Sequence, residues 1–184
     1  IELFHTLSFK GMPDFFVDNS HPNRATTFWI ISRLMASVGI AVTSFISDSA
    51  KSTVNKKVFV IPLALLSIAV LILATYFPEF FPSMHMEDLS LSPVKVALEY
   101  VVIFFFLLTT VKLLVEYART REYLAGLMAG ALIFSIFAEL AFVSYSQVYD
   151  IYNYLGHVYK FIASFLIFRV TFIHEVRKPY IEMY

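Results

Sequence analysis

The stretch VFVIPLALLSIAVLILATYF, from Val58 to Phe77, contains no charged side chain. An α-helix rises about 1.5 Å per residue, so a stretch of this length can cross a hydrocarbon core about 30 Å thick. Its Pro62 falls in the first turns, where proline is tolerated. We therefore predict a transmembrane helix here.

Four further segments are similarly long and apolar, and together the five predict an all-α fold, a polytopic transmembrane helical bundle. The predicted spans cover residues 26–46, 58–77, 93–115, 123–143 and 152–173. Within one domain of residues 1–184, residues 1–25 are predicted as an outer segment and 174–184 as a cytoplasmic exit. The chain begins with Ile1 and reads like the end of an earlier helix, so further spans are expected upstream.

The composition indicates that lipid surrounds most of the chain, so a lipid bilayer is a predicted partner. Of the 184 residues, 59% are hydrophobic and 15% charged, and the mean hydropathy is +0.72. The formal net charge of +0 and the lack of a basic block give no reason to expect nucleic acid. With Cys 0, disulfides, thiolate metal sites and cysteine nucleophiles are excluded. No Walker loop, Gly-x-Ser-x-Gly or His-Glu-x-x-His motif is present, so no catalytic residues are predicted.

Loop charge predicts the orientation, because lysine and arginine concentrate on the cytoplasmic side. Alternate connections are basic, with the charges Lys51, Lys56, Lys57, Arg119, Arg121, Arg177 and Lys178. The other connections are acidic, with Glu79, Glu87, Asp88 and Asp150. We therefore expect the N-terminal segment outside and the C-terminus in the cytoplasm.

Ionisable side chains inside spans are costly, so each is a hypothesis for a functional site. Five of them fall in the outer half, roughly 6 to 12 Å below the boundary. They are Arg33, Glu99, Glu139, His157 and Lys160. Lys112 and Arg169 lie near the inner ends, where long side chains can snorkel.

Helical spacing places His157, Lys160 and Ser164 on one face of the last span. If this face points inward, two acids and two bases can form a network around a titratable histidine. The alternative is structural: static bridges, or a local pair of Glu99 with Lys95. A second weak pattern, Gly126-x-x-x-Gly130, predicts close helix packing inside the chain rather than a dimer face.

Histidines on the predicted outer side are candidates for holding a metal or haem iron. The candidates are His5, His21 and His157, but no pair has the spacing of metal ligands. The alternative is neutral, hydrogen-bonded or solvent-exposed histidines.

Several ordered pieces of sequence are together similar to a known family. They are HTLSFKGM from His5 to Met12, His21-Pro22-Asn23, Phe28 to Arg33, Glu139 to Phe142, GHVYK from Gly156 to Lys160, and Arg177 to Tyr180. In this order they resemble the third type of bacterial membrane-associated sensor domain, abbreviated MASE. The resemblance covers the whole chain.

The resemblance implies a sensory input module of the bacterial inner membrane. Relatives are fused to cytoplasmic diguanylate cyclase, phosphodiesterase or histidine kinase outputs, which commonly work as dimers, so any enzymatic activity would belong to such an output. The family's recurring polar residues fall on His5, His21, Asn23, Arg33, Glu139, His157 and Lys160. With Glu99, and with Trp29 and Tyr159 as aromatic walls, they predict an outward-facing pocket for a small ligand or a proton. The last span is expected to carry the signal inward.

Three rival functions stay open from the sequence. The first is a redox membrane protein that binds haem or a metal. The second is a transporter or proton-coupled carrier whose substrate flux depends on Glu139 and Lys160. The third is a structural scaffold.

Overall fold

The computed structural model describes residues 1–15, 17–19, 23–46, 57–86, 90–145 and 150–177. Within these ranges every regular element is helical, and the only extended pairing is an isolated bridge between His85 and Leu91. The prediction of an all-α membrane fold is therefore confirmed.

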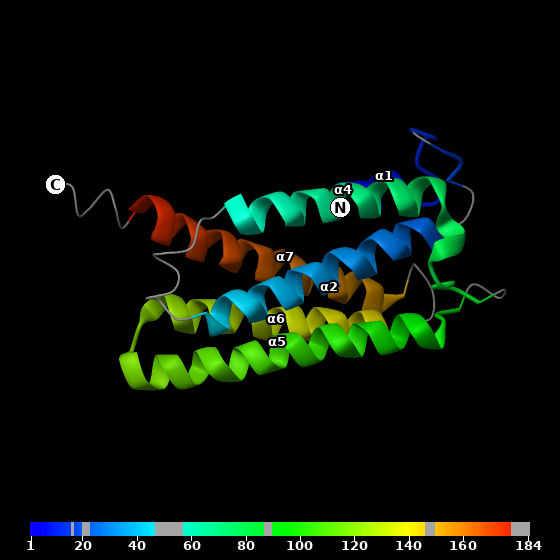
Figure 1. Ribbon diagram of the computed structural model, residues 1–184. Helices are drawn as coiled ribbons and strands as arrows, with labels where there is room; N and C mark the ends of the chain where they lie inside the picture. The colour runs from blue at the N-terminus through cyan, green and yellow to red at the C-terminus, as the bar shows by residue number, and fades with distance from the viewer. Residues whose placement is uncertain (16, 20–22, 47–56, 87–89, 146–149, 178–184) are drawn as a thin grey trace. The chain divides into compact units, whose positions relative to one another are not determined.

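The helices follow one another along the chain as shown in Figure 1. They are α1 (Glu2–Leu7), α2 (Asn23–Phe45), α4 (Lys57–Tyr76), η1 (Pro78–Phe80), α5 (Pro93–Thr120), α6 (Tyr123–Ser144), α7 (Ile151–Phe172) and the π-helix η2 (Ile173–Arg177). The chain divides into two compact units. The first contains Ile1–Ala36 and Phe45–Leu98, and the second contains Ser37–Ser44 and the chain from Glu99 onward.

Four helices are long and apolar enough to cross a membrane: α2, α5, α6 and α7. The fifth, α4, is a continuous helix through Pro62, and its apolar part Val60–Tyr76 is shorter. The main difference from the sequence prediction is at α5, which runs on to Thr120 instead of ending near Val115. The added turn contains Glu116 and Arg119, charged side chains that a helix can carry where it leaves the hydrocarbon.

Side-chain caps define where two of these helices begin. Ser92 precedes α5, and its Oγ accepts a hydrogen bond from the Lys95 N–H at 3.2 Å, while Pro93 takes the first helical position. Asp150 precedes α7, and its carboxylate accepts from the Tyr152 N–H at 3.1 Å. Both starts satisfy N–H groups that the helix itself cannot pair.

The turn between α5 and α6 depends on a left-handed residue. Arg121 has φ 56°, and its N–H donates to the Tyr117 carbonyl at 2.9 Å, which caps the end of α5. The ring of Tyr117 then lies against Gly126 of α6, where an added Cβ would stand 3.0 Å from Cδ2. The turn therefore brings the two helices close at this end.

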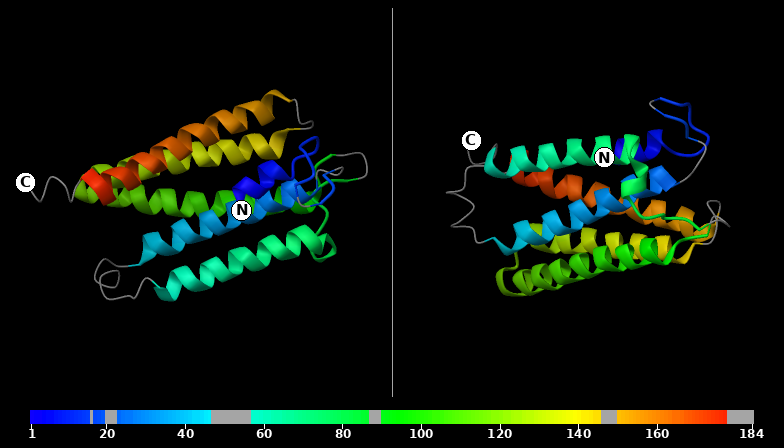
Figure 2. Two further views of the ribbon diagram at one scale, coloured as in Figure 1. Left: turned by 90° about the horizontal axis from the view of Figure 1, so that it is seen from above. Right: turned by 45° about the vertical axis from the view of Figure 1, so that its right-hand side comes forward.

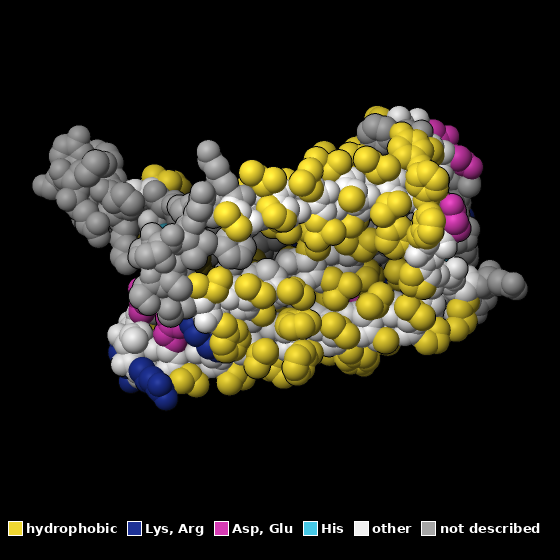
Figure 3. Space-filling model, viewed as in Figure 1, with side chains coloured by type: hydrophobic (Ala, Val, Ile, Leu, Met, Phe, Trp, Pro, Cys, Tyr) yellow, Lys and Arg dark blue, Asp and Glu magenta, His cyan; other side chains and the backbone are white. Residues whose placement is uncertain are grey.

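The helix surfaces match a lipid solvent. Large apolar side chains of α4 are exposed along its length, including Val60, Leu63, Leu65, Ile68 and Ile72. Figure 3 shows hydrophobic side chains covering α4 and α5. Hydroxyl groups within the helices donate to carbonyls one turn back: Thr43, Ser67, Thr109, Thr110 and Ser135. These hydroxyl groups are thus satisfied without water.

Helices α6 and α7 run antiparallel and pack along their lengths (Figure 2). They approach closely at Gly156 of α7, where an added Cβ would stand 2.7 Å from Cε1 of Phe142. Gly156 and Ala163 are the buried residues of α7. A small residue thus permits close packing at Gly156, a position that the sequence did not predict. Gly130, the second glycine of the predicted pattern, takes no part, because a Cβ there would meet nothing within 4 Å.

A wider turn follows α7. The N–H of Ile173 donates to the carbonyls of Arg169 and Val170, and residues Ile173–Arg177 continue as a π-helix. The backbone therefore stays helical beyond the apolar part of the last span.

Gly156→Ala should destabilise the protein, because its methyl group would overlap the ring of Phe142. Overpacking of this kind typically costs about 1–3 kcal/mol. We expect a lower midpoint of thermal unfolding in detergent.

Gly130→Ala is the matched control, since it makes the same change in open space. It should leave stability unchanged or raise it slightly, because alanine favours the helix. Equal melting midpoints for both variants would contradict the close approach at Gly156.

Candidate functional site

In the first unit, three predicted site residues form a column. The His5 Nδ1 lies 2.7 Å from the Ala25 carbonyl oxygen, and the His5 and Trp29 rings are 5.3 Å apart. The Arg33 guanidinium lies 5.6 Å from the Trp29 ring centroid, in a cation–π arrangement. Trp29 and Arg33 are only 5% and 8% exposed. The column therefore holds a buried positive charge against an aromatic face.

The hydrogen bond to Ala25 determines the tautomer of His5. A carbonyl oxygen can only accept, so Nδ1 must carry the hydrogen. In the neutral ring Nε2 is then the acceptor nitrogen. This is the arrangement that a histidine adopts when a backbone carbonyl orients it for a ligand or metal.

Local contacts position the column. Phe4 of α1 lies 6.0 Å from Phe28 of α2, ring centroid to ring centroid. Asn19 closes the loop after α1, because its Nδ2 donates to the carbonyls of Leu7 and Pro13 at 3.2 and 3.0 Å. The segment that contains α1 is thus folded back on the first turns of α2.

Asn23, another predicted site residue, joins the start of α2 to the segment before α5. Its Oδ1 accepts from the Met84 N–H at 2.6 Å, and the neighbouring Thr26 hydroxyl lies 2.9 Å from His85 Nε2. Asn23 is among the site residues predicted from the sequence, and His85 is not. Both side chains tie the segment before α5 to α2.

In the second unit, two carboxyl groups are fully buried. Glu99 of α5 and Glu139 of α6 are both 0% exposed. Lys95, one helical turn before Glu99, is 1% exposed. Buried ionisable groups in apolar helices are costly and point to function.

Tyr145, just beyond α6, belongs with Glu99. Burial, and then the negative charge of Glu99, raise the pKa of Tyr145 to about 12. The phenol therefore keeps its proton further into the alkaline range than an ordinary tyrosine does. Tyr145 was not among the site residues predicted from the sequence.

The predicted residues of α7 lie beside aromatic rings of α6. The His157 ring meets Phe142 edge-on, with centroids 5.2 Å apart, and Tyr159 lies 5.8 Å from Phe137 and 6.2 Å from Phe134. His157 and Ser164 are exposed and Lys160 is half-buried. The face of α7 that packs in the structure is therefore the one with the small residues Gly156 and Ala163. It is not the face with His157, Lys160 and Ser164 that was predicted to point inward.

The structure thus brings His5, Trp29 and Arg33 together in one unit, and it buries Glu99 and Glu139 in the other. His21 lies outside the described residues. The predicted pairing of Arg33, Glu139 and Lys160 in one pocket stays a prediction. Among the residues described, no three histidine, aspartate or glutamate side chains gather as metal ligands.

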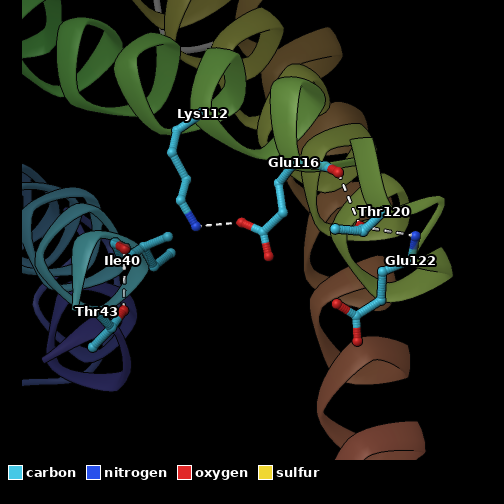
Figure 4. A network of polar contacts seen from close by, with 6 residues as sticks. All are labelled: Ile40, Thr43, Lys112, Glu116, Thr120 and Glu122. Carbon is cyan, nitrogen blue, oxygen red and sulfur yellow. Dashed lines mark hydrogen bonds and ion pairs between the residues drawn. The ribbon is translucent and has the colours of Figure 1, made fainter. Parts of the chain in front are cut away.

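At the other end of α5, Lys112 forms an ion pair with Glu116 (Figure 4). The Glu116 carbonyl accepts from the Thr120 hydroxyl at 2.9 Å, and the Glu122 N–H donates to that hydroxyl at 3.2 Å. Lys112 was predicted to snorkel toward the end of its span, and its ammonium pairs with Glu116, which lies one turn nearer that end. This cluster belongs to the end of the helix.

The apolar helices and their buried charges define a multi-pass membrane protein. The sequence matches a family model, MASE3, described as a membrane-associated sensor domain, over residues 1–179. The chain therefore belongs to the MASE3 family of membrane-associated sensor domains, as the sequence resemblance predicted. No curated protein and no solved structure gave a significant match.

Glu99→Gln should lower the pKa of Tyr145 from about 12 toward its ordinary value of 10.0, and only part of the way, because burial is the larger cause. The raised pKa favours the folded protein below pH 10, and this contribution is lost as the pH rises from 10 through 12. Phenolate absorbance during alkaline titration, as the difference from Tyr145→Phe, measures this pKa. An unchanged Tyr145 titration in Glu99→Gln would contradict the electrostatic contact.

Proposed function

We propose that this membrane sensory module binds a small ligand, or changes protonation, at the ionisable residues of its outer half. The observation that carries the proposal is the complete burial of Glu99 and Glu139 in apolar helices. Buried charges stabilise a fold less well than apolar packing does, so their presence favours a role in switching. The family match to a sensor domain supports the same role.

The contact between α6 and α7 could transmit a change at Glu139 to the last helix. Glu139 and Phe142 are three residues apart and share the buried face of α6. Phe142 in turn lies at the closest approach to Gly156 of α7. A change in charge or occupancy at Glu139 therefore acts one turn from the contact that fixes α7.

The size of such a shift is limited by differential affinity. A stimulus can move α7 only as far as it favours one helix arrangement over another, and a few kcal/mol suffice for a useful shift. A small rotation or translation of a packed helix is within this range.

The output is proposed from the family resemblance. It would be a cytoplasmic diguanylate cyclase, phosphodiesterase or histidine kinase domain, joined to the exit after α7 and working as a dimer. The same resemblance supports the bacterial inner membrane as the location. The basic turn with Arg119 and Arg121 supports a cytoplasmic position for that end of α5, and dark blue side chains gather there in Figure 3.

Glu139→Gln should change the state of α7 without changing the shape of the side chain. We would attach an environment-sensitive fluorophore to Val176→Cys, an exposed position after α7, in a chain that has Cys 0. The emission should shift with external pH between about 5 and 8, and the shift should be lost or displaced in Glu139→Gln.

Glu79→Gln is the control, because it neutralises an exposed carboxylate of η1. It should behave like the parent protein. If Glu139→Gln and Glu99→Gln both match the parent in resting emission and in response, the buried carboxyls are not the sensing element.

A topology experiment tests the orientation. Single cysteines at Glu79 and Arg119 should react with a membrane-impermeant maleimide from opposite sides. In intact cells Glu79→Cys should react and Arg119→Cys should not, and inverted vesicles should give the reverse. Labelling of Arg119→Cys in intact cells would overturn the proposed cytoplasmic C-terminus.

A further inference from the structure

The turn between α5 and α6 carries two exposed arginine side chains. Arg119 lies in the last turn of α5, and Arg121 follows the end of the helix. Among the residues that the structure describes, neither guanidinium pairs with a carboxylate, and the nearby acid Glu116 is already paired with Lys112 (Figure 4). The turn therefore presents two positive charges to its surroundings.

Arg121 occupies a backbone position that favours glycine. Its φ of 56° is left-handed, and a residue with this conformation after a helix is usually glycine, because a Cβ is strained there. The N–H of Arg121 caps the Tyr117 carbonyl at 2.9 Å, a bond that glycine would make equally well. Since the turn itself gains nothing from arginine, the side chain points to a role outside the backbone.

The length of α5 places this turn among lipid headgroups. Its 28 residues extend about 42 Å at a rise of about 1.5 Å each, whereas the hydrocarbon core is about 30 Å thick and the bilayer with its headgroup regions about 40–45 Å. The ends of a helix that crosses this core therefore reach the depth of the lipid phosphates. Tyr117 and Tyr123, exposed on either side of the two arginines, have the amphipathic rings that favour this level.

An exposed apolar stripe on α5 leads to Arg119. Its side chains are three or four residues apart and so share one face of the helix: Phe104, Leu108, Val111 and Val115. Arg119 follows Val115 by four residues and continues the same line. A hydrocarbon chain that lies along this stripe therefore ends at the arginines.

We propose that this turn binds the phosphate group of an anionic phospholipid, with one acyl chain lying along the apolar stripe of α5. The guanidinium groups of Arg119 and Arg121 supply several N–H donors in a planar fork, which suits phosphate oxygens. The site is separate from the buried carboxyl groups, so the proposal does not depend on the sensing proposal.

Two features select this ligand. A zwitterionic phospholipid carries a choline or ethanolamine cation, which the arginines repel, so a lipid with net negative charge is favoured. A free phosphate ion has no hydrocarbon to place on the stripe, so a lipid is favoured over a soluble anion.

Glu122 opposes the attraction. It follows Arg121 directly and is exposed, with its N–H donating to the Thr120 hydroxyl at 3.2 Å. A carboxylate beside the two arginines repels phosphate. Neutralising Glu122 should therefore strengthen binding, which gives the site a variant of opposite sign.

Lipid titration of the purified protein in a neutral detergent, read by native mass spectrometry, tests the site. Phosphatidylglycerol is the anionic probe and phosphatidylcholine the zwitterionic one. Arg121→Gly keeps the left-handed turn and removes the charge, and Arg119→Gln keeps a long polar side chain. We expect the affinity for phosphatidylglycerol to fall about five-fold for each arginine removed, the effect of one basic residue near an anionic surface, and to rise in Glu122→Gln.

Arg169→Gln is the matched control. It removes an exposed arginine from the last turn of α7 with the same change in net charge. It should bind phosphatidylglycerol like the parent protein, and the affinity for phosphatidylcholine should stay low in every variant.

Three outcomes would overturn the proposal. Equal losses in Arg169→Gln and in the Arg119 and Arg121 variants would mean that net charge, and not this turn, attracts the lipid. An unchanged affinity in the double variant, with the melting midpoint of the parent, would show that the arginines do not touch the lipid. If inorganic phosphate raised the melting midpoint of the parent and phosphatidylglycerol did not, the ligand would be a free anion.

Discussion

The absence of water from the hydrocarbon core constrains every part of this protein. Each peptide group in that region must bond within the chain, which leaves helices as the means of crossing. The same constraint explains why the hydroxyls of Thr109, Thr110 and Ser135 return to their own helix carbonyls. It also makes the burial of Glu99 and Glu139 informative, since neither carboxylate has bulk water to solvate it.

The sequence was sufficient for the features that depend on composition along the chain. Long apolar segments predicted the helices, because hydrophobic length is a direct requirement of the bilayer. Depth counting placed five ionisable residues inside the spans, and three of them, Arg33, Glu99 and Glu139, are buried. Each of these features needs only the position of a residue along its own helix.

Features that depend on helix rotation or on distant contacts were harder to predict. The Gly126-x-x-x-Gly130 pattern suggested close packing at the wrong second glycine, and the close approach occurs at Gly156. The role of Gly156 depends on which residue of α6 faces it, and periodicity within α7 gives no information on that. The contact between Asn23 and the Met84 N–H, and the effect of Glu99 on Tyr145, likewise join segments far apart in sequence.

The π-helix after α7 has a geometric consequence for whatever polypeptide continues from it. A turn closed by hydrogen bonds five residues apart contains more residues than an α-turn, so each residue advances through a smaller angle. Over Ile173–Arg177 the backbone therefore lags behind an uninterrupted α-helix. Val176 therefore points in a different direction from the one that the phase of α7 alone would give. Tightening this single turn into α-geometry would rotate Val176 about the helix axis without any change in the membrane-embedded part of α7.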